Sequence, residues 1–383
     1  MSKTLPRGWQ EVKLGDIAEI IMGQSPQSEF YNKDKKGLPF LQGSSTFGYI
    51  YPTFDMYSSD IKKVAKDGSI LMSVRAPVGD INIANTDICI GRGLCSINSI
   101  NKSINSYIFY ILKYNKNKLL NNQKGTTFGA ITKDDIINFN IILPPIDEQK
   151  RIADILSTFD DLIENLKKLI EKKELYKKGI MQRVLSSEVR FNGFTDEWEN
   201  VKLKDILIVG SKDRVLDTSK YKKITIKLHN KGIEFSNIER KMADKRPFYI
   251  RKKDEIIIGK QNYFNGSIAI VGEEFDNTIC SNAIMSFTVN KNCNNKFIYF
   301  LLSRKSYMQK YYHLANGTGQ KELSESDFLN FNLLIPSLEE QNKIAELLTL
   351  IDQDIDNLKQ LLHLRKLQKK GLMQKLLTGE VRI

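Results

Sequence analysis

The sequence predicts a mixed α/β fold in which two globular domains are joined by two long antiparallel helices. Three observations lead to this prediction. The chain has 383 residues, which is enough for two domains that each bury a core. One segment occurs twice, so the chain is an internal tandem repeat. That segment has apolar residues at the three-to-four spacing of a long amphipathic helix. If the two helices pack antiparallel, a pseudo-two-fold axis relates the two domains.

The repeat is strong. Residues 131–191 and 323–383 align without a gap, and about 26 of about 61 positions are identical. Weaker matches precede it: Trp9 with Trp198, Ile88-Cys89 with Ile279-Cys280, and Gly125-Thr126 with Gly317-Thr318. Each half therefore has about 190 residues, in which a divergent segment of about 140 residues is followed by the repeated tail.

The repeated tail predicts one long helix in each half. The first is expected from Asp147 to Leu185, a length of about 58 Å at about 1.5 Å per residue. The second is expected to begin after Ser337, which stands three residues before Glu340 as in a capping box. A helix this long needs a partner, and the other copy supplies one in a two-stranded coiled coil. The expected division is a globular domain (1–145), a spacer helix (146–190), a second globular domain (191–336) and a second spacer helix (337–383).

Gly179 and Gly371 stand at matching positions inside the two helical patterns. Each costs about 1 kcal/mol of helix stability relative to alanine. Two interpretations are open: a close approach of another backbone compensates for this cost, or both helices break at the glycine.

The divergent segments are predicted to be mixed α/β domains. Short apolar runs between Gly, Asn and Asp residues indicate strands, at 68–74 and 80–84 in the first half and at 255–259 and 267–271 in the second. Amphipathic stretches indicate helices at 104–114 and 295–312. Cys89 and Cys280, flanked by apolar residues, are expected to be small core residues.

The composition favours a polyanionic partner. The chain has 58 Lys and Arg residues against 45 Asp and Glu, a formal net charge of +13, and phosphate contacts supply most non-specific affinity for nucleic acid. No stretch approaches the roughly 18 apolar residues that span a bilayer, so we expect no membrane partner and a cytoplasmic protein with free thiols. The cysteines form no CxxC pair and the three histidines stand singly, so no metal site is expected.

Motifs for catalysis were not found. The sequence has no Gly-x-Gly-x-x-Gly, no phosphate-binding P-loop, no His-Glu-x-x-His and no Gly-x-Ser-x-Gly. The nearest string to an amino-methyltransferase motif, at 143–146, lacks the polar first residue. Asp254 and Glu255 fit a turn before a strand rather than an acid pair. We therefore expect neither a cofactor nor a catalytic residue.

Candidate DNA-binding residues are polar side chains in basic and aromatic surroundings. Gln and Asn pair with adenine, Arg and Lys with guanine, and Ser or Thr with either base or with phosphate. The candidates are Gln24, Ser25, Gln42, Ser44, Arg75, Arg92, Lys124, Thr126 and Thr127 in the first half, and Lys227, His229, Lys260, Gln261, Asn262, Tyr263, Asn265, Asn282, Thr318, Gln320 and Lys321 in the second. For each of them a plain solvated loop is the alternative, and for Arg75 a structural salt bridge.

The whole chain resembles the specificity subunits of type I restriction-modification systems. The resemblance rests on SVRAPVGDINIA followed by CIGRGL, on GTTFGAIT, and on the repeated LPPIDEQKRIADIL and IPSLEEQNKIAELL. It implies a non-catalytic subunit with two target-recognition domains, each binding one half of a two-part site in double-stranded DNA. It also implies that the helical repeats are spacers and docking surfaces for two methyltransferase (modification) subunits, which restriction subunits join.

One segment departs from the family pattern. GKQNYFNGSIAIV stands in the second half where the first has SVRAPVGDINIA, which fits two domains with different half-site preferences. Other interpretations remain: a DNA-modifying enzyme such as a nuclease or methyltransferase, a non-catalytic assembly protein, or a specificity chain of a fused or related restriction system.

If the helices space two domains about one DNA turn apart, roughly 34 to 36 Å, they act as a ruler. We predict that inserting one helical turn into the first spacer lengthens the gap between the two half-sites. Sequencing of methylated DNA measures this gap, and an unchanged gap would refute the ruler.

Overall fold

The computed structural model describes residues 5–121, 130–236, 246–314 and 322–383. The chain forms two compact units. The first unit contains residues 1–169 and 358–383, and the second contains residues 170–357. Each unit therefore holds one globular domain, the beginning of one long helix and the end of the other.

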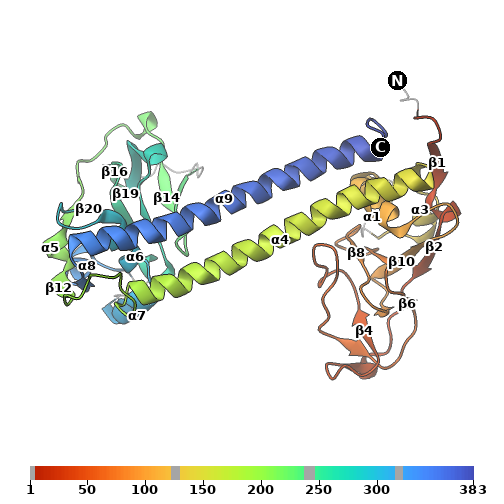
Figure 1. Cartoon of the computed structure of the whole chain (residues 1–383), viewed down its shortest axis with the longest axis horizontal. Coiled ribbons are helices and arrows are strands. Elements are labelled where there is room, and N and C mark those ends of the chain that lie inside the picture. The colour runs from red at the N-terminus through yellow and green to blue at the C-terminus, as the bar shows by residue number, and fades with distance from the viewer. Residues whose placement is uncertain (1–4, 122–129, 237–245, 315–321) are drawn as a thin grey trace. The chain divides into compact units, whose positions relative to one another are not determined.

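The first unit contains two small sheets and a two-stranded ribbon (Figure 1). One sheet has the order β2-β10-β7-β8, with Ala18–Met22, Leu94–Ser99, Ile70–Ser73 and Ile81–Ile83. The other has the order β3-β5-β4-β9-β6, with Tyr31–Asn32, Tyr57–Ser58, Leu38–Leu41, Ile88–Ile90 and Val64–Ala65. Strand β1 (Gln10–Lys13) pairs antiparallel with β11 (Asn140–Leu143). The strands expected at 68–74 and 80–84 are thus confirmed as β7 and β8.

Helices complete the core of the first unit. Alpha helices are α1 (Asn105–Tyr114), α2 (Lys116–Asn121) and α3 (Lys133–Ile137), and 3-10 turns span Leu14–Asp16 and Ser28–Phe30. Tyr107 and Phe109 of α1 lie in one hydrophobic cluster with Leu156 of the first long helix and Leu376 of the second. The last turns of the chain are therefore part of the core of the first domain.

The second unit repeats this plan. Its four-stranded sheet has the order β13-β20-β17-β18, with Leu207–Val209, Ile284–Val289, Ile256–Gly259 and Ile268–Ile270. The other antiparallel pairs are β12 (Glu199–Lys202) with β21 (Asn332–Ile335), β14 (Ile224–Ile226) with β15 (Ile233–Phe235), and β16 (Phe248–Arg251) with β19 (Thr278–Ser281). The strands expected at 255–259 and 267–271 are confirmed as β17 and β18.

The second core is also built from both ends of the spacer helices. Its short helices are α5 (Leu203–Ile206), α6 (Asn295–Leu302), α7 (Lys305–Tyr311) and α8 (Glu325–Leu329), with 3-10 turns at Thr218–Lys220, Tyr263–Asn265, Glu273–Phe275 and Tyr312–Leu314. The stretch predicted as one helix at 295–312 is in fact two, because the chain leaves helical geometry at Arg304. Val184 and Leu348, from opposite ends of the two long helices, share this core.

The two long helices agree with the sequence expectation. Helix α4 spans Ile146–Val184 and α9 spans Leu338–Leu377, and neither is interrupted (Figure 1). The amide of Glu340 donates to Ser337 Oγ at 3.5 Å, so Ser337 caps α9 as predicted. The Glu340 carboxylate, however, accepts hydrogen bonds from Arg190.

Ion pairs show that α4 and α9 are antiparallel within each unit. In the first unit Asp160 of α4 pairs with Lys369 of α9, and both side chains are buried. In the second unit Lys177 of α4 pairs with Asp352 of α9. These two pairs occupy matching positions of the repeat, with the acid and the base exchanged between the helices. The helix register is therefore held by the same charge pair in each unit.

In each unit, a buried glutamate at the start of one long helix pairs with an arginine that follows the other. The buried Glu148 carboxylate at the start of α4 accepts from Arg382 at 2.9 Å and from Trp9 Nε1 at 3.0 Å. Burial alone would raise the pKa of Glu148, but the hydrogen bonds from Arg382 and Trp9 outweigh it and hold the pKa below its usual value. In the second unit Arg190 donates to the buried Glu340 at 2.7 Å, but within the described ranges Nε1 of Trp198, the counterpart of Trp9, has no hydrogen-bond partner. The occurrence of this glutamate and this arginine in both repeats thus has a structural cause.

Two sequence expectations about cysteine and membranes have structural outcomes. Cys89 and Cys280 are fully buried core residues, as predicted. Among the described residues, no helix combines the length and apolar character needed to cross a bilayer.

Neither interpretation of the helix glycines is correct. Gly179 and Gly371 lie inside continuous helices, so the helices do not break there. Outside its own helix turn, a methyl group added at either position would meet no atom of the described residues within 4 Å, so no close backbone approach explains these glycines.

We predict that Gly179→Ala and Gly371→Ala each raise the free energy of unfolding by about 1 kcal/mol, because alanine has the higher helix propensity. Urea unfolding of the whole chain measures this. Gly23→Ala serves as the contrasting control, since its methyl would lie 2.2 Å from the carbonyl oxygen of Gly91 and should destabilise the fold. A loss of stability at both helix positions would contradict the prediction.

A group of cations surrounds the Asp160–Lys369 pair in the first unit. Lys113 Nζ donates to the carbonyl oxygen of Tyr49 at 3.2 Å. The pKa of Lys113 is lowered from its ordinary value of 10.5 to about 8, mainly by burial and also by the positive charges of Lys369 and Lys167, while the charge of Asp160 opposes the shift. The folded chain therefore releases a proton from Lys113 at a pH where the unfolded chain still holds it.

This shift predicts a pH dependence of stability. Between pH 8 and 10.5 the unfolded state binds the Lys113 proton and the folded state does not, so Lys113 makes the folded state more stable as pH rises through that window. In Lys113→Met this contribution is lost. The free energy of unfolding of the variant relative to that of wild type should be highest below pH 8 and should decrease as pH approaches 10. Urea midpoints at pH 7 and 9.5 measure the difference, with the exposed Lys118→Met as the control for loss of one charge; a pH-independent difference would contradict the assignment.

Candidate nucleic-acid interface

Backbone hydrogen bonds gather four loops of the first unit in one place. The amide of Gln24 donates to Ile90 O at 2.9 Å, joining the end of β2 to the end of β9. The amide of Gly93 donates to Gln42 O at 3.1 Å, and the amide of Val74 donates to Gly93 O at 2.9 Å. The chain segments that follow β2, β4, β7 and β9 therefore meet at one side of the domain. We name the candidate residues on them, Gln24, Ser25, Gln42, Arg75 and Arg92, the first edge.

Side chains of the first edge also contact each other. Ser25 Oγ donates to Gln42 Oε1 at 2.9 Å, and the amide of Arg92 donates to Ser25 Oγ at 3.1 Å. This orientation leaves the amide hydrogens of the exposed Gln42 side chain for another partner. A glutamine held at one end in this way can pair with a base edge at the other.

Glycines allow these loops to approach so closely. A Cβ at Gly91 would lie 2.7 Å from Gln42 Oε1, and one at Gly93 would lie 2.4 Å from Gln42 O. The Gly91-Arg92-Gly93 string therefore places the exposed Arg92 beside Gln42 because its neighbours have no side chain.

Arg75 stands on a turn that is fixed from within. Ser73 Oγ donates to Pro77 O at 2.7 Å and accepts from the Asp80 amide at 2.8 Å. Arg75 is exposed and has no ion pair within the described ranges, so the structural salt bridge considered above is absent there. Ser44 donates to Asp80 Oδ2 at 3.4 Å, which places its loop beside the same turn.

Two backbone hydrogen bonds of the first unit recur in the second. The amide of Lys260 donates to Ala283 O at 3.0 Å, as Val74 does to Gly93 O. The amide of Leu323 donates to Lys260 O at 3.0 Å, as Ile131 does to Val74 O at 2.9 Å.

A further bond joins another loop to these segments: the amide of His229 donates to Asn265 O at 2.8 Å. We name the candidates that these bonds bring together, His229, Lys260, Asn262, Asn265 and Asn282, the second edge. Gln261, between Lys260 and Asn262, is exposed, whereas Lys227 forms an ion pair with Glu234 at 3.5 Å.

One candidate is wrong. Tyr263 is fully buried, and its hydroxyl donates to Leu302 O at 2.9 Å. Its ring packs edge to face on Phe328. The polar loop around Tyr263 predicts a surface residue, but its side chain belongs to the hydrophobic core.

Six candidates lie outside the described residues: Lys124, Thr126, Thr127, Thr318, Gln320 and Lys321. They stay predictions of the sequence. Within the described ranges, no group of three or more His, Cys, Asp or Glu side chains is placed to hold a metal ion.

The structure adds residues that the sequence analysis missed. A recess of about 220 Å³ beside the second edge is lined by Lys260 and Asn282 together with Ser211, Lys212, Tyr249, Arg251, Ser286 and Glu325. The contributing segments are far apart in the sequence, so no local motif indicates the recess. The one available signal was Arg251, a charged residue at the end of a run that otherwise predicts a buried strand.

Comparisons with known proteins were made for the whole chain. A family profile described as "Type I restriction modification DNA specificity domain" matches residues 6–174 and 195–364. The type I restriction enzyme MjaVIII specificity subunit of Methanocaldococcus jannaschii is 26% identical over 412 residues, covering 99% of this chain and 94% of that protein.

Two further similarities differ in extent. A protein of the same organism described as a type I restriction enzyme MjaX specificity subunit is 48% identical over 189 residues, which is 49% of this chain and 44% of that protein's length. The crystal structure of a type I restriction-modification system S subunit from M. genitalium shares the fold, with a TM-score of 0.63, 18% identity and 98% coverage of both chains.

Proposed function

Because the chain belongs to the family of type I restriction-modification specificity subunits, we propose that it selects a two-part DNA site, with one half-site bound at each edge. The observation that carries this proposal is that two backbone hydrogen bonds recur in both units, beside loops that present different side chains. Shared backbone bonds with divergent side chains suit two domains that bind different sequences in the same way.

The chemistry of the edges supports DNA as the ligand. The first edge offers the exposed side chains of Gln24, Gln42, Arg75 and Arg92, and the second offers the exposed Asn282 and the half-buried Lys260. Amide and guanidinium groups of this kind form bidentate pairs with adenine and guanine in the major groove. The net charge of +13 adds the sequence-independent attraction to phosphate.

Exposed leucines on the long helices support a protein partner. Leu169 of α4 and Leu361 of α9 occupy matching positions of the repeat, and so do Leu175 and Leu367; all four are exposed, Leu175 by 70%. Single exposed leucines are common on protein surfaces, so the support comes from the recurrence of these exposed leucines at matching positions of both repeats. Since each position occurs once per repeat, we propose that two copies of one methyltransferase subunit dock here, and that restriction subunits join them.

The methyl transfer itself is assigned to that partner, and this chain contributes specificity rather than catalysis. Methyl transfer to DNA by the purified chain with a methyl donor would overturn this assignment.

The proposed function is tested by single-molecule sequencing of DNA from cells that express this chain with the neighbouring methyltransferase subunit, compared with cells that lack only this chain. We expect a chain-dependent methylated adenine in a two-part motif with a fixed gap. Unchanged methylation, with both proteins expressed and associated, would reject the proposal.

The docking surface predicts a graded loss of association. Leu175→Ser and Leu367→Ser should each weaken binding of one methyltransferase copy, by about ten-fold for loss of a buried leucine contact, and the double variant should weaken both. Light scattering of the purified complex measures the number of copies bound. Leu216→Ser, at a leucine that is 93% exposed in the second globular domain, is the matched control. Full occupancy in the double variant would contradict the assignment.

A further inference from the structure

The second unit contains a buried charge pair that the first unit lacks. Arg251 ends strand β16 and Glu255 precedes β17, and both side chains are more than nine-tenths buried. In the first unit, Ala65 and Ser69 precede the equivalent strand β7 by the same numbers of residues as Arg251 and Glu255 precede β17. The pair is therefore a feature of one recognition domain and not of the common fold.

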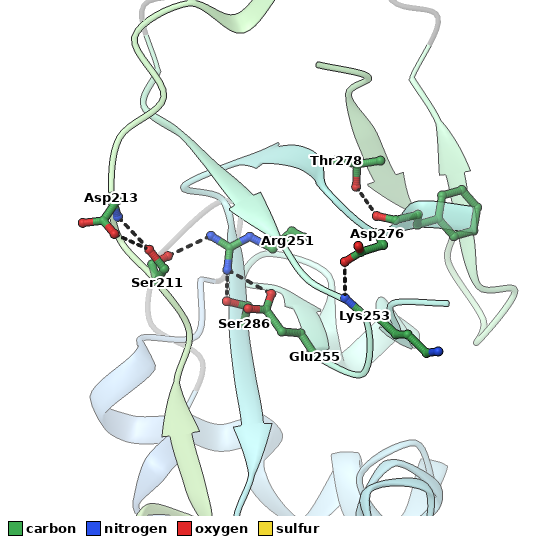
Figure 2. Close-up of polar contacts among 9 residues, drawn as sticks. Ser211, Asp213, Arg251, Lys253, Glu255, Asp276, Thr278 and Ser286 are labelled. Carbon is green, nitrogen blue, oxygen red and sulfur yellow. Dashed lines mark hydrogen bonds and ion pairs between the residues drawn. The ribbon is translucent and has the colours of Figure 1, made fainter. Parts of the chain in front are cut away.

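Arg251 joins three segments of the chain (Figure 2). Its Nη1 donates to Ser286 Oγ of β20 and to Glu255 Oε2, the latter at 3.4 Å. Its Nη2 donates to the carbonyl oxygen of Ser211 at 3.1 Å. Ser211 follows β13, where the chain leaves the sheet, so the guanidinium group determines where that departing segment lies.

Glycine makes room for this arrangement. A Cβ at Gly210 would lie 2.1 Å from Ser286 Oγ, 3.1 Å from Arg251 Nη1 and 3.2 Å from Glu255 Oε1. The chain at Gly210 thus passes directly over the guanidinium group, and the amide of Gly210 donates to Ser286 O at 2.8 Å.

The segment that Arg251 holds forms one wall of the recess beside the second edge. Lys212 follows Ser211 and pairs with Glu325 at 2.7 Å across the recess. Lys260 and Asn282 line the same recess. Arg251 therefore holds a wall that faces two residues of the second edge.

Stability alone is a poor explanation for this pair. Burying a guanidinium and a carboxylate costs several kcal/mol of desolvation, and apolar residues of similar volume are often as stable. Burial raises the pKa of Glu255, although the charge of Arg251 opposes this, as expected for a carboxyl that is costly to bury. Arg251 Nε is buried without a hydrogen-bond partner. What the pair supplies is a defined position for the Ser211–Lys212 segment.

We propose that Arg251 is a positioning residue for DNA specificity, which places Lys212 against Lys260 and Asn282 so that the recess accepts one particular base-pair step of the second half-site. This inference rests on the proposed function and adds a residue that acts on one half-site only.

The test replaces both charges in the double variant Arg251→Met with Glu255→Met, in the full chain bound to its methyltransferase subunit. Urea unfolding should show a folded chain of nearly unchanged stability. Sequencing of methylated DNA should show discrimination at one or more base pairs of the second half-site reduced by about ten-fold or more, with the first half-site unchanged. Gln42→Ala, in the first edge, identifies the half-site that belongs to the first unit.

The matched control removes an exposed charge pair from the same unit. Lys253, two residues after Arg251 in the chain, forms an ion pair with Glu273. The two side chains are 51% and 79% exposed. Lys253→Met with Glu273→Gln should leave both half-sites unchanged. If the Arg251 double variant does not fold, Ser286→Ala removes one acceptor of the guanidinium and keeps both charges; it should relax the same half-site.

Three results distinguish the possible failures. An unchanged motif in a folded Arg251 variant would overturn this inference and leave the proposed function intact. Equal relaxation of both half-sites would overturn it as well, because the residue would then act on overall binding. Absence of a chain-dependent motif with the wild-type chain would reject the proposed function itself.

Discussion

The structure depends on a buried carboxylate at the start of each long helix. Glu148 and Glu340 lie in apolar surroundings, and an unpaired charge there would cost several kcal/mol. Each is satisfied by an arginine that follows the end of the other helix, Arg382 for Glu148 and Arg190 for Glu340. Neither helix start is complete without the other helix end, so the antiparallel pairing is required by the electrostatics of burial. Each unit therefore contains the start of one long helix and the end of the other.

The same pairing explains why the tails of the two halves are similar while the rest diverges. The Asp160–Lys369 and Asp352–Lys177 pairs need the same residues at the same register in both copies. The edges do not depend on the pairing of the helices, because their shape is set within each unit by backbone hydrogen bonds and by local residues such as Gly91, Gly93 and Arg251. The side chains of an edge can therefore change while the helices keep their pairing, as the proposed function requires.

The two edges reach a defined geometry by different means. In the first edge, glycines at 91 and 93 bring the loops into contact, and one hydroxyl, that of Ser25, links Gln42 to the backbone of Arg92. In the second, a buried guanidinium holds the chain that leaves the sheet. Gly91 and Gly93 allow two chain segments to come close, whereas the buried charge of Arg251 needs hydrogen-bonding partners. Each edge is therefore sensitive to substitution of the residues that fix it, the glycines in the first and the arginine in the second.

The sequence by itself determined the two-unit repeat, both ends of the first long helix to within one residue, the start of the second, the main strands and the burial of Cys89 and Cys280, because these follow from local periodicity and from similarity between the halves. Its edge candidates were chosen by residue type, which could not separate Tyr263, a core residue, from its exposed neighbours. Only the tertiary structure decided that separation and revealed the role of Arg251. Burial and the meeting of distant segments are set by the packing of the whole unit, which no stretch of sequence contains.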